Sequence, residues 1–220
     1  MRATYRVSYA VKEIYYTLQG EGANAGSPAV LLRFSGCNLW SGREEDRSTA
    51  ICRFCDTDFR GTDGANGGKY QTAEGLADKV AAVFPFDAER FEPWVVCTGG
   101  EPLLQLDDAL LAALMKRGFR IAIETNGTIL LASQTFVNWI TVSPKAVAPL
   151  KQTWGNELKL IYPQSGAEPE RYEGLGFDHF FLQPMDGPKR EENTTLAVRY
   201  CLDHPNWRLS VQVHKMLGLP

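Results

Sequence analysis

Long hydrophobic runs and an excess of basic residues are both missing from this sequence of 220 residues. No apolar stretch reaches the roughly 18–20 residues that a membrane-spanning helix needs, and the first residues do not form the hydrophobic region of a secretory signal peptide. The formal net charge is −3, whereas a surface that neutralises phosphates normally has a positive excess. We therefore expect a cytoplasmic protein that does not bind nucleic acid directly and does not enter a membrane.

Histidine is scarce, with three residues, and cysteine occurs five times, which is an odd number. Reduced thiols in the cytoplasm fit this composition better than a disulfide framework. A phosphate-binding P-loop signature is also lacking. The remaining composition, 44% hydrophobic and 22% charged, is that of an ordinary globular chain, and we expect a single domain over residues 1–220.

Three of the cysteines, Cys37, Cys52 and Cys55, follow an apolar run at 29–34 that is expected to be a strand. Three thiolates on a loop at a strand end indicate a metal or cluster site. A four-iron cluster held by three cysteines keeps one iron open for another ligand. A zinc site of three cysteines and one histidine is the alternative, and the nearest histidine along the chain is His179. Ligand chemistry alone leaves both alternatives open.

A second motif, TGGEP at 98–102, follows the apolar run 94–97 and is therefore also expected after a strand. Two glycines at such a turn let the backbone approach a ligand closely. Together, the three-cysteine loop and the TGGEP turn resemble the radical S-adenosylmethionine (SAM) enzymes, in which the open iron binds the amino and carboxylate groups of SAM. The usual spacing in those enzymes is Cys-x3-Cys-x2-Cys, whereas fourteen residues separate the first two cysteines here.

Two further motifs accompany this expanded cysteine gap, LQGEG at 18–22 and DTD at 56–58. In this combination the chain resembles the 7-carboxy-7-deazaguanine synthase family, and the resemblance extends from residue 18 to Pro220. It implies a carbon–nitrogen lyase of queuosine biosynthesis that converts 6-carboxy-5,6,7,8-tetrahydropterin to 7-carboxy-7-deazaguanine and releases ammonia. In the implied reaction a hydrogen atom is abstracted at C6, the ring contracts, a hydrogen atom returns, and SAM is regenerated.

The resemblance also implies the cofactors and partners of the reaction. The cofactors are a 4Fe-4S cluster, SAM and Mg²⁺, the substrate is a pterin, the electron donor is a reducing flavoprotein, and the enzyme is a homodimer. One rival is a glycyl-radical activase of the radical SAM type, which fits the TGGEP turn but not the cysteine gap or LQGEG. The other is a zinc-binding module without enzyme activity, which leaves TGGEP, SPK at 143–145 and QPMD at 183–186 unexplained.

Short apolar strands recur in the second half of the chain, and polar residues follow most of them. Strands that alternate with helices or long connections indicate a parallel sheet, and barrel enzymes build their sites at the carboxyl ends of such strands. We predict an α/β fold, an incomplete (β/α)6 TIM-like barrel of the radical SAM type, with six parallel strands and with shortened or missing helices in its second half.

The expected elements can be placed along the chain from periodicity and capping residues. Helices are expected after Thr72, after Asp107 and at 191–202. Strands are expected at 29–34, 94–97, 120–123, 139–142, 157–162, 180–182 and 208–213, with an extended arm or strand at 2–16. Residues 60–71 are expected to be a linker, and 41–51 an insertion in the cysteine loop with a short solvated helix packed by Leu39, Trp40 and Ile51.

By the resemblance, individual side chains are assigned to the cluster and to each ligand. The catalytic cluster ligands are Cys37, Cys52 and Cys55, and Thr57 is the magnesium ligand. The substrate residues are Leu18, Gln19, Gly20, Glu21, Arg33, Thr98 and Pro220, the last through a C-terminal carboxylate. The SAM residues are Phe54, Cys55, Asp56, Gly100, Glu124, Asn126, Ser143, Lys145, Gln183 and Asp186.

Arg33 has two interpretations, because it lies in the middle of an apolar run and a buried charge needs a partner. A structural ion pair is the ordinary one. Bidentate recognition of a substrate carboxylate is the other, since the planar guanidinium suits it, and the resemblance favours this second interpretation. Thr57 likewise has a plainer interpretation, as a cap or turn residue.

Overall fold

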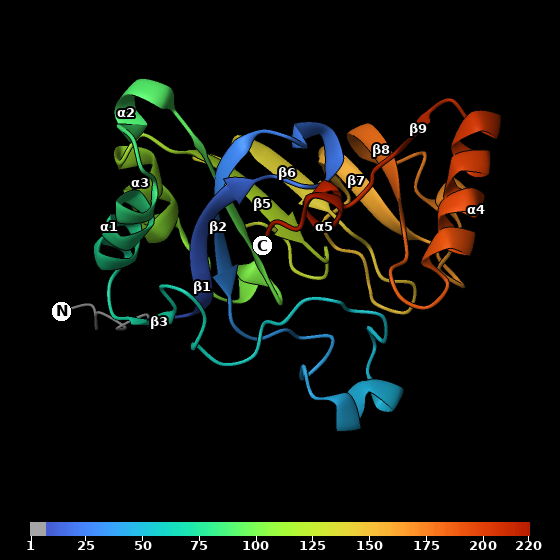
Figure 1. Ribbon diagram of the computed structural model, residues 1–220, viewed down its shortest axis with the longest axis horizontal. Coiled ribbons are helices and arrows are strands. Elements are labelled where there is room, and N and C mark those ends of the chain that lie inside the picture. Colours follow the sequence, from blue (N-terminus) through green and yellow to red (C-terminus); the bar gives the residue numbers. More distant parts are fainter. Residues whose placement is uncertain (1–7) are drawn as a thin grey trace.

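The computed structural model describes residues 8–220, and its central element is one sheet of nine strands (Figure 1). The strand order is β3-β1-β2-β4-β5-β6-β7-β8-β9. Strands β2, β4, β5, β6, β7, β8 and β9 are parallel to one another. Strand β1 is antiparallel to both of its neighbours, β2 and β3. The strands are β1 (Tyr9–Leu18), β2 (Pro28–Phe34), β3 (Gly68–Tyr70), β4 (Trp94–Gly99), β5 (Arg120–Thr125), β6 (Trp139–Val142), β7 (Trp154–Tyr162), β8 (Gly176–Pro184) and β9 (Trp207–Leu209).

Alternation of side chains along the strands decides what each face of the sheet contacts. In β2, Val30, Leu32 and Phe34 are fully buried in a core that faces the helices. Leu31 and Arg33, which point the other way, line a cavity on the inner face. The outer face is therefore apolar, while the inner face carries the charged and polar strand residues beside a small apolar cluster that includes Leu31 and Val96.

Helices cover the outer face at the two ends of the sheet, as Figure 1 shows. Helices α1 and α3 pack on the first strands, and α4 packs on β8 and β9. The α-helices are α1 (Ala73–Val83), α2 (Ala88–Phe91), α3 (Asp108–Lys116), α4 (Arg190–Asp203) and α5 (Val213–Leu217), and the 3₁₀ helices are η1 (Gly22–Asn24), η2 (Glu44–Thr49), η3 (Pro102–Leu104) and η4 (Pro169–Arg171). Among residues 8–220, no helix has both the length and the apolar character needed to cross a membrane.

The predicted partial barrel is confirmed: strands β2 and β4 to β8 are the six expected parallel strands, and the short β9 extends them at one edge. Between β5 and β8 the described chain has loops and the single turn η4 where a regular barrel has helices. The N-terminal strand is present as β1, while the part of that prediction at 2–7 lies outside the described residues.

Three local predictions differ from the structure. The linker at 60–71 contains β3, which pairs with the free edge of β1. The strand expected at 208–213 ends at Leu209, because the chain then turns across the cavity, where the backbone N–H of Val213 donates to Gly20 O at 2.9 Å. In the insertion, Leu39 and Trp40 are buried beside η2, but Ile51 is 45% exposed and does not pack against it.

Asp107 caps α3 and also joins the helix to the sheet, and its replacement tests the contribution of both contacts to stability. Its Oδ1 accepts hydrogen bonds from the backbone N–H of Leu110 at 2.9 Å and from the buried Tyr9 hydroxyl at 2.8 Å. Losing an N-cap costs about 1 kcal/mol and losing a hydrogen bond costs about 1 kcal/mol. Asp107→Ala is therefore expected to lower the free energy of unfolding in urea by about 2 kcal/mol. The exposed Asp108→Ala, which loses only a dipole interaction, should cost about 0.5 kcal/mol, and equal losses would contradict the assignment.

Candidate active site

A cavity of about 350 Å³ opens on the inner face, between the carboxyl ends of the parallel strands and the loop that carries the cysteines. Every residue that the sequence assigned to the cluster, SAM, the substrate or magnesium lines this cavity. The strand ends and the cysteine loop, which are far apart in the sequence, therefore meet as the predicted fold requires. The role of each residue stays a prediction.

The three predicted cluster ligands, Cys37, Cys52 and Cys55, are free thiols that line the cavity. The Cys52 thiol donates a hydrogen bond to Cys55 and so lowers the pKa of Cys55 to about 6. The other two cysteines are elsewhere, with Cys97 in the core under the helices and Cys201 on α4. The donor set in the cavity therefore fits a cluster held by three cysteines.

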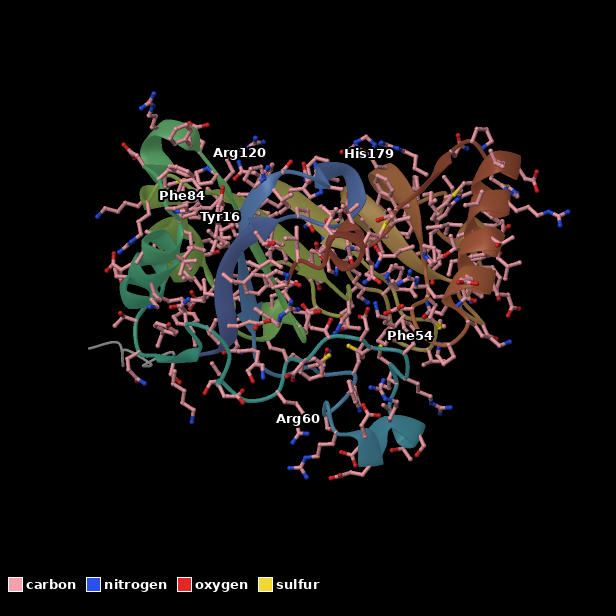
Figure 2. The ribbon with its side chains drawn as sticks, in the orientation of Figure 1. Tyr16, Phe54, Arg60, Phe84, Arg120 and His179 are labelled. Carbon is pink, nitrogen blue, oxygen red and sulfur yellow. The ribbon has the colours of Figure 1, made fainter. Side chains whose placement is uncertain are left out.

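His179, the histidine of the zinc alternative, does not line the cavity. It stacks on Trp139 with ring centroids 6.0 Å apart, well away from Phe54 of the cysteine loop (Figure 2). Within residues 8–220, no three histidine, cysteine, aspartate or glutamate side chains are arranged to hold a single metal ion.

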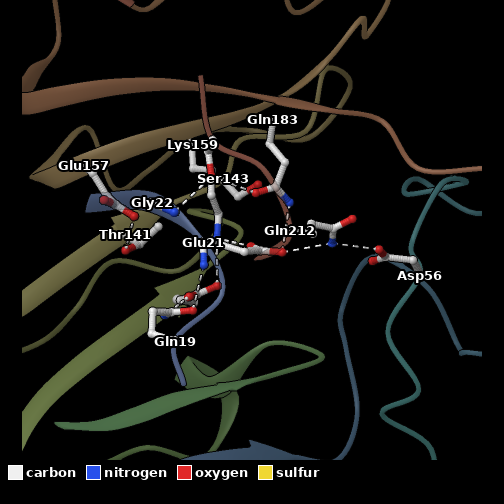
Figure 3. A network of polar contacts seen from close by, with 12 residues as sticks. Gln19, Glu21, Gly22, Asp56, Thr141, Ser143, Glu157, Lys159, Gln183 and Gln212 are labelled. Atoms are coloured by element: carbon white, nitrogen blue, oxygen red, sulfur yellow. Dashed lines mark hydrogen bonds and ion pairs between the residues drawn. The ribbon is translucent and has the colours of Figure 1, made fainter. Parts of the chain in front are cut away.

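The wall of the cavity contains a buried ammonium between two carboxylates (Figure 3). The Lys159 side chain is 4% exposed and forms ion pairs with Glu21, from the loop after β1, and with Glu124 of β5. Its Nζ lies 3.0 Å from Glu124 Oε2, and Gln19 Nε2 donates to Glu124 Oε1 at 2.8 Å. Gln183 of β8 donates to Glu21 Oε1 at 3.0 Å. Glu124 and Gln183, predicted for SAM, thus contact the loop predicted for the substrate.

Electrostatics keep Glu21 and Lys159 charged. Burial acts to raise the pKa of Glu21, but the Lys159 ammonium outweighs burial and lowers that pKa to about 2. Burial acts to lower the pKa of Lys159, and the carboxylates of Glu124 and Glu21 outweigh it, so the pKa rises. Near neutral pH, Glu21 therefore presents only acceptor oxygens and Lys159 only donors.

The chain after β9 crosses the cavity and connects the loop after β1 to the cysteine loop. Gln212 Nε2 donates to Glu21 Oε1 at 2.9 Å and to Asp56 Oδ2 at 3.1 Å. Lys215 Nζ lies 2.6 Å from carboxylate oxygens of both Asp56 and Asp186. The two predicted SAM carboxylates are thus held together by one lysine.

A buried hydrogen-bond network joins the TGGEP turn to the start of the cysteine loop. Glu101, which is fully buried, accepts from the Thr125 hydroxyl and from the backbone N–H of Asn126, both at 2.8 Å. Asn126 Nδ2 donates to Asn38 Oδ1 at 3.0 Å, and Asn38 Nδ2 donates to the Thr128 hydroxyl at 2.7 Å. Since Asn38 follows Cys37 directly, this network fixes the position of the first cysteine.

Arg33 has the structural ion pair that its ordinary interpretation predicts. Its Nε lies 2.7 Å from Glu13 Oε1, directly across the antiparallel β1–β2 pair, and its Nη2 donates to the Tyr15 hydroxyl at 3.0 Å. Arg33 also lines the cavity. The ion pair with Glu13 is present, and recognition of a substrate carboxylate by Arg33 stays a prediction.

Several cavity residues are not predicted by any sequence motif, among them the polar Lys159, Gln212, His214 and Lys215. For Lys159 the sequence does carry a signal, because Glu157 and Lys159 alternate with leucines in a strand, which puts both charges on one face. For the other three, the placement depends on the chain turning back after β9, which no local pattern indicates.

Similar proteins and a similar solved structure identify the family of the chain, although no protein-family model matches it. It is 64% identical over 214 residues to the 7-carboxy-7-deazaguanine synthase of Caulobacter vibrioides, covering 97% of this chain and 100% of that one. It is 59% identical over 215 residues to the synthase of Burkholderia multivorans, with the same coverage. The crystal structure of QueE from Escherichia coli matches with a TM-score of 0.70 and 27% identity, over 94% of this chain and 95% of that one.

These similarities extend over nearly the whole chain and agree with the cysteine loop and the TGGEP turn. They confirm the resemblance drawn from the sequence motifs and do not favour the glycyl-radical activase. The chain belongs to the 7-carboxy-7-deazaguanine synthase family.

Proposed function

We propose that the cavity converts 6-carboxy-5,6,7,8-tetrahydropterin to 7-carboxy-7-deazaguanine with loss of ammonia, using SAM catalytically. The observation that carries the proposal is that three free cysteines and a buried group of ionised acceptors line the same cavity. The cysteines fit a radical-generating cofactor, and the acceptors fit a polar, planar heterocycle. The relatives are named for the product of this reaction.

Cys37, Cys52 and Cys55 would hold the 4Fe-4S cluster, and cavity residues beside them would hold SAM. When bound, the cluster supplies the electron that cleaves SAM to the radical that starts the reaction. Lys145 is suited to the SAM site because it lies 5.9 Å from the Phe54 ring centre and bonds the Ser143 hydroxyl at 2.9 Å. Its ammonium is thus fixed against two residues assigned to SAM.

The substrate would lie over the loop after β1. Glu124 is reassigned here from SAM to the substrate, because it contacts Gln19 of the substrate loop and Lys159. Glu21 and Glu124 present carboxylate oxygens to the N–H groups of the aminopyrimidinone edge, and Arg33 faces the substrate carboxylate with a guanidinium already oriented by Glu13. Gln212 and Lys215 cross the cavity above this loop. That segment excludes water from the reacting atoms, which is the protein's main contribution when a cofactor supplies the chemistry.

Magnesium, the redox partner and the assembly form a further part of the proposal. Thr57 lines the cavity and offers the hard oxygen ligand that Mg²⁺ prefers. A reducing flavoprotein would supply the electron, and two chains would form a homodimer. Five free thiols require a reducing compartment, which supports a cytoplasmic location.

The test is anaerobic reconstitution of the full chain with iron and sulfide, followed by incubation with SAM, dithionite, Mg²⁺ and 6-carboxy-5,6,7,8-tetrahydropterin. Mass spectrometry is expected to detect 7-carboxy-7-deazaguanine with little net loss of SAM. Tetrahydropterin without the 6-carboxylate is the matched control and should not react. A reconstituted protein that cleaves SAM but leaves the carboxylated pterin unchanged would refute the proposed substrate.

A further inference from the structure

Strand β7 presents two charged residues to the inner face of the sheet, Glu157 and Lys159. Residues two apart in a strand share a face, while Leu158 and Leu160 between and after them are fully buried in the outer core. Both charged side chains are themselves buried. Two buried charges on one strand are costly unless partners satisfy them. The residues that pair with Glu157 and Lys159 therefore show which part of the site the strand holds in place.

Glu157 contacts the backbone of the loop after β1. Its Oε2 accepts from the backbone N–H of Ala23 at 2.8 Å. Its Oε1 accepts from the Thr141 hydroxyl at 2.9 Å, and Figure 3 shows these two side chains. Gly22 has φ +66°, and a Cβ there would lie 2.2 Å from Glu157 Oε1. The second glycine of LQGEG is therefore favoured by its left-handed φ, and the loop backbone lies directly against this carboxylate.

Lys159 contacts one side chain of the same loop, that of Glu21. It forms one ion pair with Glu21 and another with Glu124 of β5, and it is almost completely buried between them. One residue of β7 therefore holds the loop backbone at Ala23, and the next residue on that face holds the loop side chain at Glu21.

We propose that Lys159 is a positioning residue that keeps the Glu21 and Glu124 side chains together as paired acceptors for the substrate, with Glu157 fixing the loop backbone below them. This inference rests on the proposed function and deepens it. The substrate class it selects is a planar heterocycle with adjacent N–H donors, as in a 2-amino-4-oxopyrimidine ring.

Removal of the ammonium changes the hydrogen-bonding character of the cavity. Without Lys159, two buried carboxylates face each other and one of them takes up a proton, because like charges in a buried site cannot both ionise easily. A protonated carboxyl donates one hydrogen bond where the substrate needs an acceptor. The variant cavity is therefore expected to recover substrate binding as pH rises and its carboxylates ionise again.

Other charged groups also face this site and enter the pH argument. Glu157 lies on the same strand, Lys145 approaches from the loop after β6, and His214 of α5 acts on Glu21. The carboxylates outnumber the basic groups in direct contact with them once Lys159 is removed. Rising pH is thus expected to ionise the carboxylates in the variant, while wild-type Glu21 stays ionised throughout because the Lys159 ammonium holds its pKa low.

The experiment compares Lys159→Met with Lys159→Arg in the reconstituted enzyme, between pH 6 and pH 8.5. Lys159→Met is expected to raise KM for the pterin about 100-fold at pH 6 and to recover part of that loss by pH 8.5. Lys159→Arg restores the positive charge and should give a pH-independent KM within about 10-fold of wild type. Both variants keep Cys37, Cys52 and Cys55, so the iron bound after reconstitution should equal that of the wild type.

Lys189→Met is the matched control, because the side chain is 75% exposed on the surface, and it should leave KM unchanged. A KM for Lys159→Met that parallels wild type across the pH range would overturn the inference. If that variant fails to fold, Glu157→Gln decides. A KM raised about 10-fold with the wild-type iron content supports the inference, and an unchanged KM overturns it. Wild-type enzyme that does not convert the pterin would instead refute the proposed function itself.

Discussion

Cys55→Ala is expected to reduce pterin turnover to the uncatalysed level and to lower the iron bound after reconstitution. Three cysteines line the cavity, and the remaining two, Cys97 and Cys201, lie in the outer core and on α4. No spare thiol in the cavity can replace the lost ligand. Because the Cys55 side chain is only partly buried, the free energy of unfolding should change by about 1 kcal/mol or less. Iron analysis, product formation and urea unfolding of the same preparation measure all three effects.

Cys201→Ala is the matched control for the loss of a thiol. Its side chain is partly buried on α4, outside the cavity, so iron content and turnover should equal those of the wild type. Full iron content together with near-native turnover in Cys55→Ala would remove Cys55 from the cluster ligands. In Cys201→Ala, full iron content and near-native turnover are expected. A loss of iron in that variant would show that the assay responds to the loss of any thiol.

The part of the site that could be predicted from the sequence consists of residues in local motifs. Cys37 and the TGGEP turn each follow an apolar strand, and the carboxyl ends of parallel strands meet at one edge. Their meeting in one cavity therefore follows from the fold class. The partial barrel could be predicted for the same reason, since each strand of the second half is an apolar run of its own.

The part that could not be predicted depends on contacts between distant segments. Lys215 joins Asp56 to Asp186 only because the chain turns back across the cavity after β9. The strand β3 forms only because β1 offers an unpaired edge, and its own glycine-rich sequence has little strand propensity. Contacts between distant segments decide both cases, and the hydrophobic periodicity of the sequence does not indicate them.

Gly100→Ala is expected to have the second largest effect, although it adds a single methyl group. A Cβ at this position would lie 2.0 Å from the backbone oxygen of Gly36 and 2.9 Å from Cys37 Cβ. Neither neighbour is the end of a flexible side chain, so the backbone must move. The turn cannot retreat freely, because the backbone N–H of Glu101 donates to Gly36 O at 3.0 Å and the Glu101 carboxylate is held in its buried network.

The cysteine loop is therefore the part expected to shift, and Cys37 would shift with it. A displacement of about 1 Å at a reacting centre can cost roughly 100-fold in rate, so turnover should fall at least that far, with iron content reduced and with about 1–3 kcal/mol of stability lost to overpacking. Gly174→Ala is the matched control, because a Cβ there meets no atom within 4 Å. Iron content and turnover unchanged in Gly100→Ala would mean that the TGGEP turn and the cysteine loop are not in the close contact that positions the first cluster ligand.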